Sequence, residues 1–340
     1  MSEQALPDQP FRAFRLREDG SGGEVTEIRL DDLSPGEVVI HTAYSSVNYK
    51  DALAGTGSAP IARTLPLVGG IDVAGRVVAS SDPAFAAGDA VLVTGCGLSE
   101  TRDGGYAEYL RASADDVIAI PSGLDPHSAM VLGTAGFTAG LALLRMEENG
   151  LTPEHGPIVV TGASGGVGSL AVDLFAGRGY EVVAVSGKSD AAAWLEELGA
   201  ARVIGRDEIT TKGRPLEKGV WGGAVDNVGG PVLAELLRTT VPWGSVAAIG
   251  LAGGQDVNTT VMPFIIRGVS LLGITSANCP RHYREAVWQH LATDWRPRHL
   301  DRIRAADVDL EELPDVFRRM LAGETQGRTV VRTGTDAGDA

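Results

Sequence analysis

The hydrophobic positions of this chain are spaced in two different ways, and the spacing changes after the first third. In the first third, short apolar runs are separated by Asp-Gly, Gly-Gly and Pro-Gly pairs, which favour turns. Strands are therefore predicted at residues 13–16, 24–30, 37–43, 75–79, 90–94 and 117–120. Many short strands separated by turns are typical of a barrel-like or sandwich-like unit.

From about residue 128 onward, apolar strands alternate with helical stretches. Strands are predicted at 157–161, 181–186, 202–204, 223–227, 245–249 and 269–274, and helices at 165–178, 190–198 and 232–239. The remaining segment predicts helices at 281–293 and 310–322 and a last strand at 328–332. Because such alternation builds βαβ units, the predicted fold class is α/β, with a doubly wound parallel sheet (a Rossmann domain) beside a β-rich domain.

Composition restricts the possible partners and compartments. Of the 340 residues, 29 are Lys or Arg and 44 are Asp or Glu, so the net charge is 29 − 44 = −15. Such an acidic chain is a poor partner for nucleic acid, which needs a basic surface. The two cysteines, Cys96 and Cys279, form no C-x-x-C pair, which argues against a disulfide framework. No apolar run is expected to reach the roughly 18–20 residues of a membrane span, so a cytoplasmic protein is expected.

The strongest local signal is the segment PIVVTGASGGVG at residues 157–168. An apolar strand leads into glycines, and a predicted helix follows at once. Gly162 allows a tight turn, and Gly168 lets the helix pack close to the sheet. The residues between them, Ser164, Gly165, Gly166 and Val167, place backbone N–H groups where a pyrophosphate can bind at the helix N-terminus. The strand–turn–helix context predicts a dinucleotide site.

The end of the second strand indicates which dinucleotide is bound. NAD sites usually place Asp or Glu there to hold the ribose 2′-hydroxyl. Here the strand ends in Ser186, Gly187 and Lys188. A hydroxyl donor and a cation favour a 2′-phosphate, so the predicted cofactor is NADPH. The alternative is that Lys188 is an ordinary surface lysine.

These motifs, with GTAGFTA at 133–139, resemble signatures of the zinc-independent branch of the medium-chain dehydrogenase/reductase superfamily. A closer resemblance, over nearly the whole chain, is to NADPH-dependent acrylyl-CoA reductases, a quinone oxidoreductase-like subfamily. It rests on YSSVNYKD at 44–51, PLVGGIDVAG at 66–75, GGYAE at 104–108, RDE at 206–208, RPLEK at 214–218, GLAGG at 250–254, TVMPFIIR at 260–267 and QGRT at 326–329. The resemblance implies a Rossmann NADP-binding domain, 129–276, inserted in a GroES-like catalytic domain, 1–128 and 277–340.

The resemblance also implies that the zinc sites of the superfamily are missing. Zinc relatives carry a cysteine early in the run that here reads Asn48 to Asp51, and His-Glu where this chain has Ile71 and Asp72. They carry four clustered cysteines for a structural zinc, whereas Cys96 alone lies in that region here. Zinc needs three or four such ligands, so no metal is expected.

Further cofactor contacts follow from the resemblance. Tyr44, Arg202, Leu251, Ile265 and Ser276 fall where relatives touch NADP. Arg202 would support the 2′-phosphate, Leu251 and Ile265 would flank the nicotinamide, and Ser276 would lie near its amide. The alternative for Leu251 and Ile265 is an ordinary place in the core, the default for apolar side chains.

Candidate catalytic residues come from the densest polar cluster of the predicted catalytic domain. Reduction of an activated C=C bond needs a hydride, a polarised carbonyl and a proton for the α-carbon. Tyr49 is a candidate proton donor, directly or through water, and Asn48 a candidate for orienting nicotinamide or substrate. Asp51 is a third candidate. The alternative for Asp51 is an ion pair with Lys50 that holds the loop, and this structural role is favoured.

The leading hypothesis is NADPH-dependent reduction of a short 2-enoyl-CoA, first of all acrylyl-CoA to propanoyl-CoA. Four arginines are candidates for the CoA phosphates or, alternatively, for solvated helix faces: Arg281, Arg284, Arg318 and Arg319. Two other functions stay open: an NADPH:quinone or enone oxidoreductase, and a non-catalytic NADPH-binding protein of the same fold. The resemblance further implies a homodimer.

Overall fold

The computed structural model describes residues 7, 9–209 and 213–334. The chain divides into two compact units. One, here called the β-rich unit, comprises the chain up to Thr134, Ser276–Ala292 and the chain from Arg304 onward. The other, the parallel-sheet unit, comprises Ala135–Thr275 and Thr293–Ile303.

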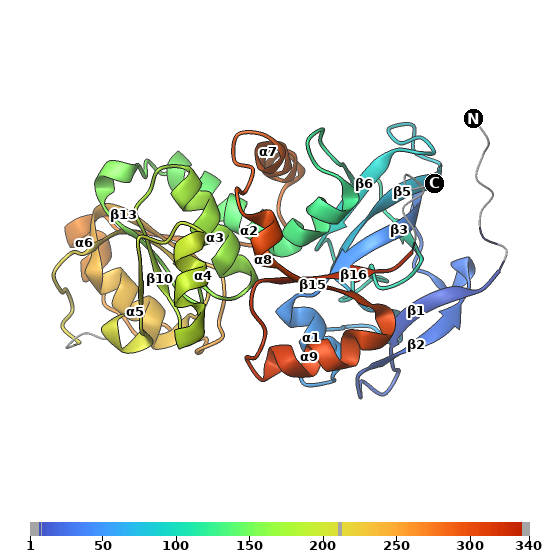
Figure 1. Cartoon of the computed structure of the whole chain (residues 1–340), viewed down its shortest axis with the longest axis horizontal. Coiled ribbons are helices and arrows are strands. Elements are labelled where there is room, and N and C mark those ends of the chain that lie inside the picture. Colours follow the sequence, from blue (N-terminus) through green and yellow to red (C-terminus); the bar gives the residue numbers. More distant parts are fainter. Residues whose placement is uncertain (1–6, 8, 210–212, 335–340) are drawn as a thin grey trace. The chain divides into compact units, whose positions relative to one another are not determined.

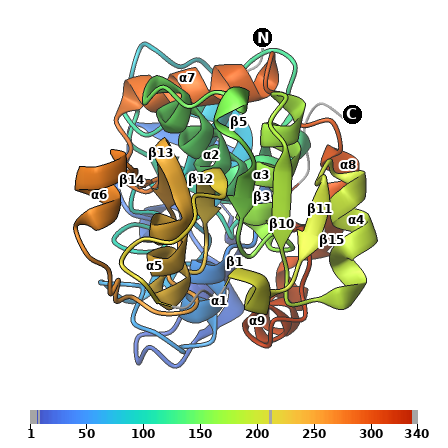
Figure 2. The same ribbon diagram turned by 90° about the vertical axis from the view of Figure 1, so that its left-hand side faces the viewer.

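The parallel-sheet unit is built on six strands in the order β11-β10-β9-β12-β13-β14 (Figure 2). They are β9 (Ile158–Val160), β10 (Val182–Val185), β11 (Arg202–Ile204), β12 (Trp221–Asp226), β13 (Thr240–Ala248) and β14 (Ser270–Gly273). All neighbouring pairs are parallel. The chain starts in the middle of the sheet, winds outward to β11, and then returns to build the other half from β12. This order is that of a doubly wound dinucleotide-binding sheet.

Helices cover both faces of this sheet because right-handed crossovers run in opposite directions from its middle. They are α3 (Gly166–Gly177), α4 (Ala192–Glu197), α5 (Gly230–Thr239) and α6 (Met262–Arg267). Figure 1 shows α3 and α4 on one side of the sheet and α5 on the other. The α5 face is filled by apolar side chains, including Val183 and Leu236. The central strands β9, β10 and β12 are buried throughout, as expected for parallel strands covered on both faces.

The β-rich unit contains two antiparallel-dominated sheets. A three-stranded sheet has the order β2-β1-β4, and a seven-stranded sheet has the order β15-β16-β3-β5-β6-β8, with β7 pairing β3. The strands are β1 (Phe11–Leu16), β2 (Gly23–Ile28), β3 (Val38–Ser46), β4 (Leu67–Val68), β5 (Asp72–Ser80), β6 (Ala90–Thr94), β7 (Tyr109–Ala112), β8 (Ile118–Ala119), β15 (Arg304–Asp309) and β16 (Arg328–Arg332). Two antiparallel β layers with this density of strands agree with the predicted β-rich unit.

Helices complete this unit and close its core. They are α1 (Tyr49–Gly55), α7 (Arg281–Ala292) and α9 (Leu313–Leu321), while α8 (Leu300–Ile303) lies in the other unit. Phe14, Tyr106 and Phe317 pack together, with ring centroids 5.6–6.3 Å apart. Strand β16, near the C-terminus, pairs with β3 (Figure 1). The predicted α/β fold class, a doubly wound sheet with a β-rich unit, is confirmed.

One helix corrects an expectation from the sequence. Helix α2 (Pro126–Glu148) is 23 residues long and, by length and composition alone, apolar enough to cross a membrane. The expectation that no apolar run approaches a membrane span was therefore wrong. The segment is rich in Gly, Ala and Thr and is only moderately apolar, and 83% of its most apolar window is buried inside the structure. It packs as a core helix, and Gly133 interrupts it with φ 51° and ψ −156°.

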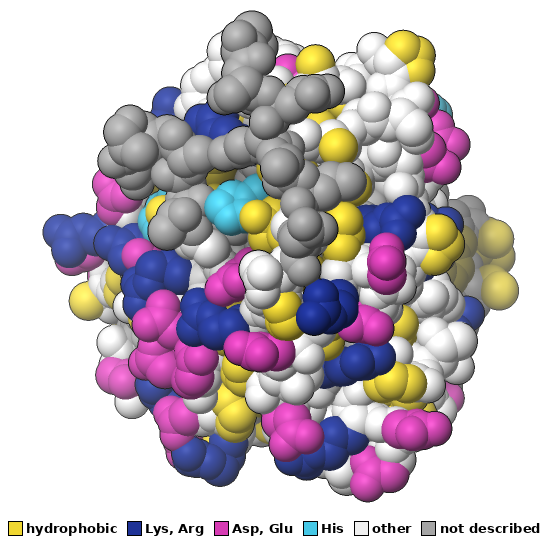
Figure 3. Space-filling model, turned by 90° about the vertical axis from the view of Figure 1, so that its right-hand side faces the viewer, with side chains coloured by type: hydrophobic (Ala, Val, Ile, Leu, Met, Phe, Trp, Pro, Cys, Tyr) yellow, Lys and Arg dark blue, Asp and Glu magenta, His cyan; other side chains and the backbone are white. Residues whose placement is uncertain are grey.

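Charged side chains of both signs are mixed on the surface. Figure 3 shows Lys and Arg side chains interleaved with Asp and Glu on the face seen from the right of Figure 1. Surface ion pairs such as Arg12–Glu108 and Arg17–Glu24 form in the β-rich unit. Among the described residues on the face in Figure 3, the basic side chains form no continuous surface of the kind that a nucleic-acid backbone requires.

Candidate functional site

The glycine turn links β9 to α3 in the parallel-sheet unit. Gly162 has φ 58°, a left-handed conformation that favours glycine. Gly165 precedes the first residue of α3 in an extended conformation, so the N–H groups of the first helical turn are open to a ligand. A side chain at Gly168 would collide with the Gly162 carbonyl oxygen. The turn therefore depends on glycine for its backbone shape and for its close packing on the helix.

Polar side chains at the end of β12 form hydrogen bonds to Thr161, the residue directly before the turn. Asp226 accepts hydrogen bonds from the Thr161 hydroxyl (2.6 Å) and from the Gly229 N–H (2.8 Å). Asn227 donates its side-chain N–H to the Thr161 carbonyl at 2.8 Å. Burial raises the pKa of the Asp226 carboxyl, and these hydrogen bonds oppose that shift. β9 and β12 are the neighbours at which the strand order reverses, the usual ligand crevice of such sheets.

Neither Asp226 nor Asn227 was predicted as a site residue. The Asn227 Oδ1 is buried and has no hydrogen-bond partner among the described residues. The signal in the sequence was a pair of polar residues directly after an apolar strand. Recognising it required knowing that this strand lies next to β9, which the sequence alone did not give.

The end of β10 brings the predicted Ser186, Gly187 and Lys188 close to the glycine turn. The Ser186 hydroxyl accepts a hydrogen bond from the Lys188 N–H at 3.0 Å and donates one to the Ser164 hydroxyl at 3.4 Å. A Cβ at Gly187 would lie only 3.0 Å from the Arg206 Nε, so the Arg206 guanidinium packs directly on this glycine. Arg206 therefore adds a second cationic side chain at the end of β10.

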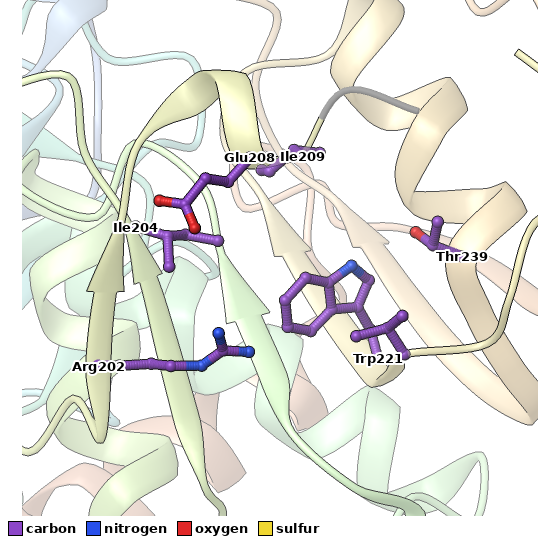
Figure 4. Close-up of a pocket in the computed structure, with 7 residues that line it drawn as sticks. Arg202, Ile204, Glu208, Ile209, Trp221 and Thr239 are labelled. Carbon is purple, nitrogen blue, oxygen red and sulfur yellow. The ribbon is translucent and has the colours of Figure 1, made fainter. Parts of the chain in front are cut away.

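The structure does not bring Arg202 to this turn, which corrects the expectation for that residue. Arg202 opens β11 opposite Val183, near the beginning of β10. Its guanidinium carbon lies 5.8 Å from the centre of the Trp221 ring, and Figure 4 shows it pointing toward that ring. Arg202 and Trp221 line a cavity of about 220 Å³ with Ile204, Glu208, Ile209, Val220 and Thr239. The sequence contains two arginines four positions apart, and only the fold shows which one faces Ser186–Lys188.

Leu251 and Ile265 are not core residues. Each has 69% of its surface exposed, although both are large and apolar. The alternative that they are ordinary core residues is therefore excluded. Tyr44 and Ser276 belong to the β-rich unit. Tyr44 lies in β3 and packs edge-on against His127, with ring centroids 5.1 Å apart, and Ser276 is half-buried.

Asn48, Tyr49 and Asp51 stand at the beginning of a helix rather than in a loop. Asn48 is the N-cap of α1, and Tyr49 is its first residue. The Asp51 carboxylate accepts the Asn48 backbone N–H at 2.9 Å and the Ile71 backbone N–H at 3.0 Å. Asp51 is buried, whereas Tyr49 is 54% exposed. Burial, and secondarily the charge of Asp72, raise the pKa of the Asp51 carboxyl to about 7.

The expected ion pair between Lys50 and Asp51 is not formed. Lys50 instead pairs with Glu100, with 2.7 Å between Nζ and Oε1. Adjacent residues of a helix point in different directions. Lys50 therefore points outward while Asp51 points into the core, where backbone N–H groups satisfy it.

A buried polar cluster surrounds the Asn48 side chain. Asp72 accepts hydrogen bonds from the Asn48 Nδ2 (2.7 Å), the Ser46 hydroxyl (2.6 Å) and the Thr134 hydroxyl (2.5 Å). Arg328 donates to the Asn48 Oδ1 at 3.1 Å. Burial lowers the pKa of the Arg328 guanidinium, and the charge of Asp72 opposes that shift. Asp72 and Arg328 lie 256 positions apart, by the difference of their numbers, so sequence patterns gave no sign of this cluster.

The four arginine candidates for CoA phosphates have different surroundings. Arg284 is buried and donates to the Asp116 carbonyl at 2.7 Å, so a solvated helix face is wrong for it. Arg281 pairs with Glu285 at 2.8 Å. Arg318 pairs with Asp315, and Arg319 is exposed. Arg318 and Arg319 thus remain the more accessible members of this group.

The donor set of the described residues does not fit zinc. Across residues 7, 9–209 and 213–334, no three His, Cys, Asp or Glu side chains gather closely enough to hold a metal ion. Asn48 contacts the carboxylates of Asp51 and Asp72, whereas zinc sites use cysteine and histidine ligands in sets of three or four. The glycine turn, by contrast, fits a dinucleotide pyrophosphate.

Comparison with known proteins agrees with this geometry. Residues 34–122 match the alcohol dehydrogenase GroES-like domain, and residues 166–293 match the zinc-binding dehydrogenase family. The chain is 48% identical to YhfP of Bacillus subtilis, a quinone oxidoreductase-like protein, over 91% of this chain and 94% of the relative. It is 45% identical to the acrylyl-CoA reductase AcuI of Ruegeria pomeroyi, over 94% of this chain and 98% of the relative.

Two solved structures are similar over their whole length. Escherichia coli YhdH with bound NADPH is 46% identical, with a TM-score of 0.91, and the match covers 95% of this chain and 100% of that one. Bacillus subtilis yhfP with bound NAD is 46% identical, with a TM-score of 0.93, over 96% of this chain and 100% of that one. The chain therefore belongs to the medium-chain dehydrogenase/reductase superfamily, with a GroES-like domain and a dinucleotide-binding domain of the zinc-binding dehydrogenase type.

Proposed function

We propose that this chain is an NADPH-dependent reductase of a C=C bond conjugated to a thioester carbonyl, with acrylyl-CoA as substrate and propanoyl-CoA as product. The observation that carries the cofactor part of the proposal is the end of β10, where residues 186–188 include no carboxylate and the Arg206 guanidinium packs on Gly187. The acrylyl-CoA reductase relative at 45% identity and the NADPH-bound relative at 46% identity support it.

The cofactor site is proposed to divide between two kinds of contact. Backbone N–H groups of residues 164–168 would hold the pyrophosphate at the α3 N-terminus, and Ser186, Lys188 and Arg206 would hold the 2′-phosphate. The exposed apolar side chains of Leu251 and Ile265 suit a nicotinamide ring, and Tyr44 and Ser276 stay proposed contacts from the β-rich unit. When bound, NADPH would supply the hydride.

The chain's own polar groups would handle the charge and the proton. Negative charge develops on the thioester oxygen as the β-carbon is reduced, so a fixed N–H donor lowers the barrier. The Asn48 amide is the proposed donor or orienting group. The exposed Tyr49 hydroxyl is the proposed proton source for the α-carbon, and Asp51 holds the backbone that carries both. Tyr49→Phe should then lower turnover in single-turnover assays, and unchanged turnover would remove Tyr49 from the mechanism.

Hydride transfer is proposed to proceed without a metal. The residues around Asn48 do not offer the donor set that zinc takes, so no step is derived through zinc. A test is elemental analysis of the purified protein together with activity after chelation. Stoichiometric zinc lost together with activity would contradict the proposal.

The proposed assembly is a homodimer formed along the edge of the parallel sheet. β14 is the last strand in the sheet order, so one of its edges has no partner strand in the described part of the chain. Large apolar side chains nearby are exposed: Trp243 at 73%, Ile266 at 62% and Leu271 at 41%. An exposed apolar edge is a ready template for strand pairing with a second copy. Light scattering at micromolar concentration should give about twice the chain mass, and Leu271→Lys should halve it. The cytoplasmic location stays a prediction.

The deciding experiment compares substrates. NADPH oxidation is followed with acrylyl-CoA, with a benzoquinone and with neither substrate. The proposal predicts turnover with acrylyl-CoA well above that with the quinone. Preference for the quinone would favour the quinone oxidoreductase alternative, which the YhfP relative supports. NADPH binding with no turnover would favour a non-catalytic NADPH-binding protein.

A further inference from the structure

A buried acid–base pair joins three distant parts of the β-rich unit. Asp72 begins β5 and Arg328 begins β16, and both side chains are buried. The Arg328 Nη2 lies 3.9 Å from the Asp72 Oδ2. The Ser46 hydroxyl bridges them: it accepts from the Arg328 Nη2 at 2.7 Å and donates to the Asp72 Oδ2 at 2.6 Å. The pair is therefore held by a shared hydroxyl as well as by charge.

Asp72 and Arg328 also form hydrogen bonds with the two ends of the Asn48 side-chain amide. Asn48 donates its Nδ2 to the Asp72 Oδ2 at 2.7 Å and accepts at its Oδ1 from the Arg328 Nη1 at 3.1 Å. A flipped amide would face an amino group toward the guanidinium and a carbonyl oxygen toward the carboxylate. Both contacts would then be repulsive, so the two charges allow only one amide orientation.

The pair also binds the interrupted part of α2. Asp72 accepts the Thr134 backbone N–H at 2.9 Å, and the Arg328 Nε donates to the Val131 carbonyl at 3.1 Å. Between these residues, a Cβ at Gly133 would lie 2.6 Å from the Asp72 Oδ2 and 2.8 Å from the Arg328 Nη2. The backbone at the break in α2 thus packs closely against Asp72 and Arg328, and this packing restricts the positions of both side chains.

We propose that Asp72 and Arg328 are positioning residues that act on the reaction through Asn48. They would set the direction of the Asn48 amide and keep its remaining N–H aimed at the developing oxyanion of the substrate. Neither residue has a place in the expected set of site residues. The inference rests on the proposed reductase activity, in which Asn48 is the donor or orienting group.

The test is a double-mutant cycle on turnover. Asp72→Asn keeps the shape of the side chain but replaces one acceptor oxygen by an amino group, so it frees the Asn48 amide to rotate. Misplacing a reacting group by a small distance costs about ten- to hundredfold in rate. The expected result is a loss of kcat in that range in the parent chain and no further loss in the Asn48→Ala background. Equal loss in both backgrounds would overturn the inference.

A second readout does not depend on activity. In ¹⁵N-labelled protein, the Asn48 side-chain amide signals are identified by their disappearance in Asn48→Ala. Asp72→Asn should shift them, while Arg17→Met, which removes an exposed ion pair in the same unit, should leave both them and kcat unchanged. Unshifted Asn48 signals in Asp72→Asn would overturn the inference even if the enzyme acts on another substrate. A shift combined with no activity toward any enone would instead count against the proposed function alone.

If Asp72→Asn does not fold, a milder variant, Ser46→Ala, still tests the inference. Ser46→Ala removes the bridging hydroxyl but leaves both charges in place. It should shift the Asn48 amide signals and lower kcat by less than Asp72→Asn does, with the loss again absent in the Asn48→Ala background. A Ser46→Ala protein with unchanged signals and unchanged kcat would contradict the inference.

Discussion

The glycine turn and the Asn48 cluster are two sites made in opposite ways. The glycine turn in the parallel-sheet unit is made of backbone, and its defining residues lie between Thr161 and Gly168. The Asn48 cluster in the β-rich unit is made of side chains contributed by β3, β5, α2 and β16. A backbone site tolerates no added atoms, whereas a side-chain site tolerates no change of charge or of hydrogen-bonding group. Substitutions should therefore have different effects in the two regions.

The largest expected effect is at Gly168. Gly168→Val adds atoms that collide with the Gly162 carbonyl oxygen, so α3 cannot pack against the turn. We expect no measurable NADPH binding in a fluorescence titration and a destabilised or unfolded protein, because overpacking in a tight backbone contact ranks among the severe mutations. The matched control is Gly273→Ala, where an added Cβ would meet nothing within 4 Å. A Gly168→Val protein that binds NADPH normally would contradict the backbone account.

The next effect is at Gly133 in the other region. Gly133→Ala places a methyl group 2.6 Å from the Asp72 Oδ2 on a residue with φ 51°. We expect a loss of about 2–4 kcal/mol in the free energy of unfolding, from backbone strain plus displacement of the buried pair. Urea denaturation measures it. NADPH affinity, measured under conditions where Gly133→Ala is folded, should fall far less than it does in Gly168→Val. Equal losses of affinity in the two variants would contradict the proposed difference between the two regions.

A smaller and more selective effect is expected at the end of β10. Arg206→Gln and Lys188→Gln each remove one charge-assisted contact to the proposed 2′-phosphate. Such contacts are worth about 1.5–3 kcal/mol, so NADPH affinity should fall roughly ten- to hundredfold while NADH affinity stays the same. Arg202→Gln is the matched control, because that side chain faces Trp221 instead. Equal losses for NADPH and NADH, or a selective loss in Arg202→Gln, would reverse the assignment.

The smallest expected effect is a pH dependence of stability. The pKa of the Asp51 carboxyl is raised from an ordinary value of 3.8 to about 7 by burial and by the charge of Asp72. Because the folded pKa is raised, its contribution to stability is fully present below pH 3.8 and is lost as the pH rises through 7. The expected slope is at most about 1.4 kcal/mol per pH unit in that window.

Urea denaturation of the parent chain and of Asp51→Asn between pH 5 and pH 8 isolates this contribution. The difference in unfolding free energy between them should shift in favour of Asp51→Asn as the pH rises. A difference that is constant over this window would mean that Asp51 does not titrate there.

The same contrast explains how much the sequence could predict. The doubly wound sheet was predictable because each strand and helix is a continuous segment with its own periodicity, and the glycine turn because its residues are consecutive. The sequence does not predict α2, because Gly, Ala and Thr blur its pattern, and it predicts a loop at Asn48–Asp51, where the structure begins α1. The ion pair of Lys50 with Glu100, the packing of Arg206 on Gly187 and the Asp72–Arg328 pair all depend on contacts between distant segments. The spacing of residue types along the chain does not indicate those contacts.

The measurement that tests the central claim most directly is isotope transfer from the cofactor to the substrate. NADPH deuterated at both C4 positions of the nicotinamide is incubated with the protein and acrylyl-CoA, and the propanoyl-CoA formed is analysed by mass spectrometry and NMR. The account predicts a product one mass unit heavier, with the deuterium on the β-carbon and a solvent proton on the α-carbon. Propanoyl-CoA without deuterium, deuterium on the α-carbon, or no propanoyl-CoA at all would contradict it.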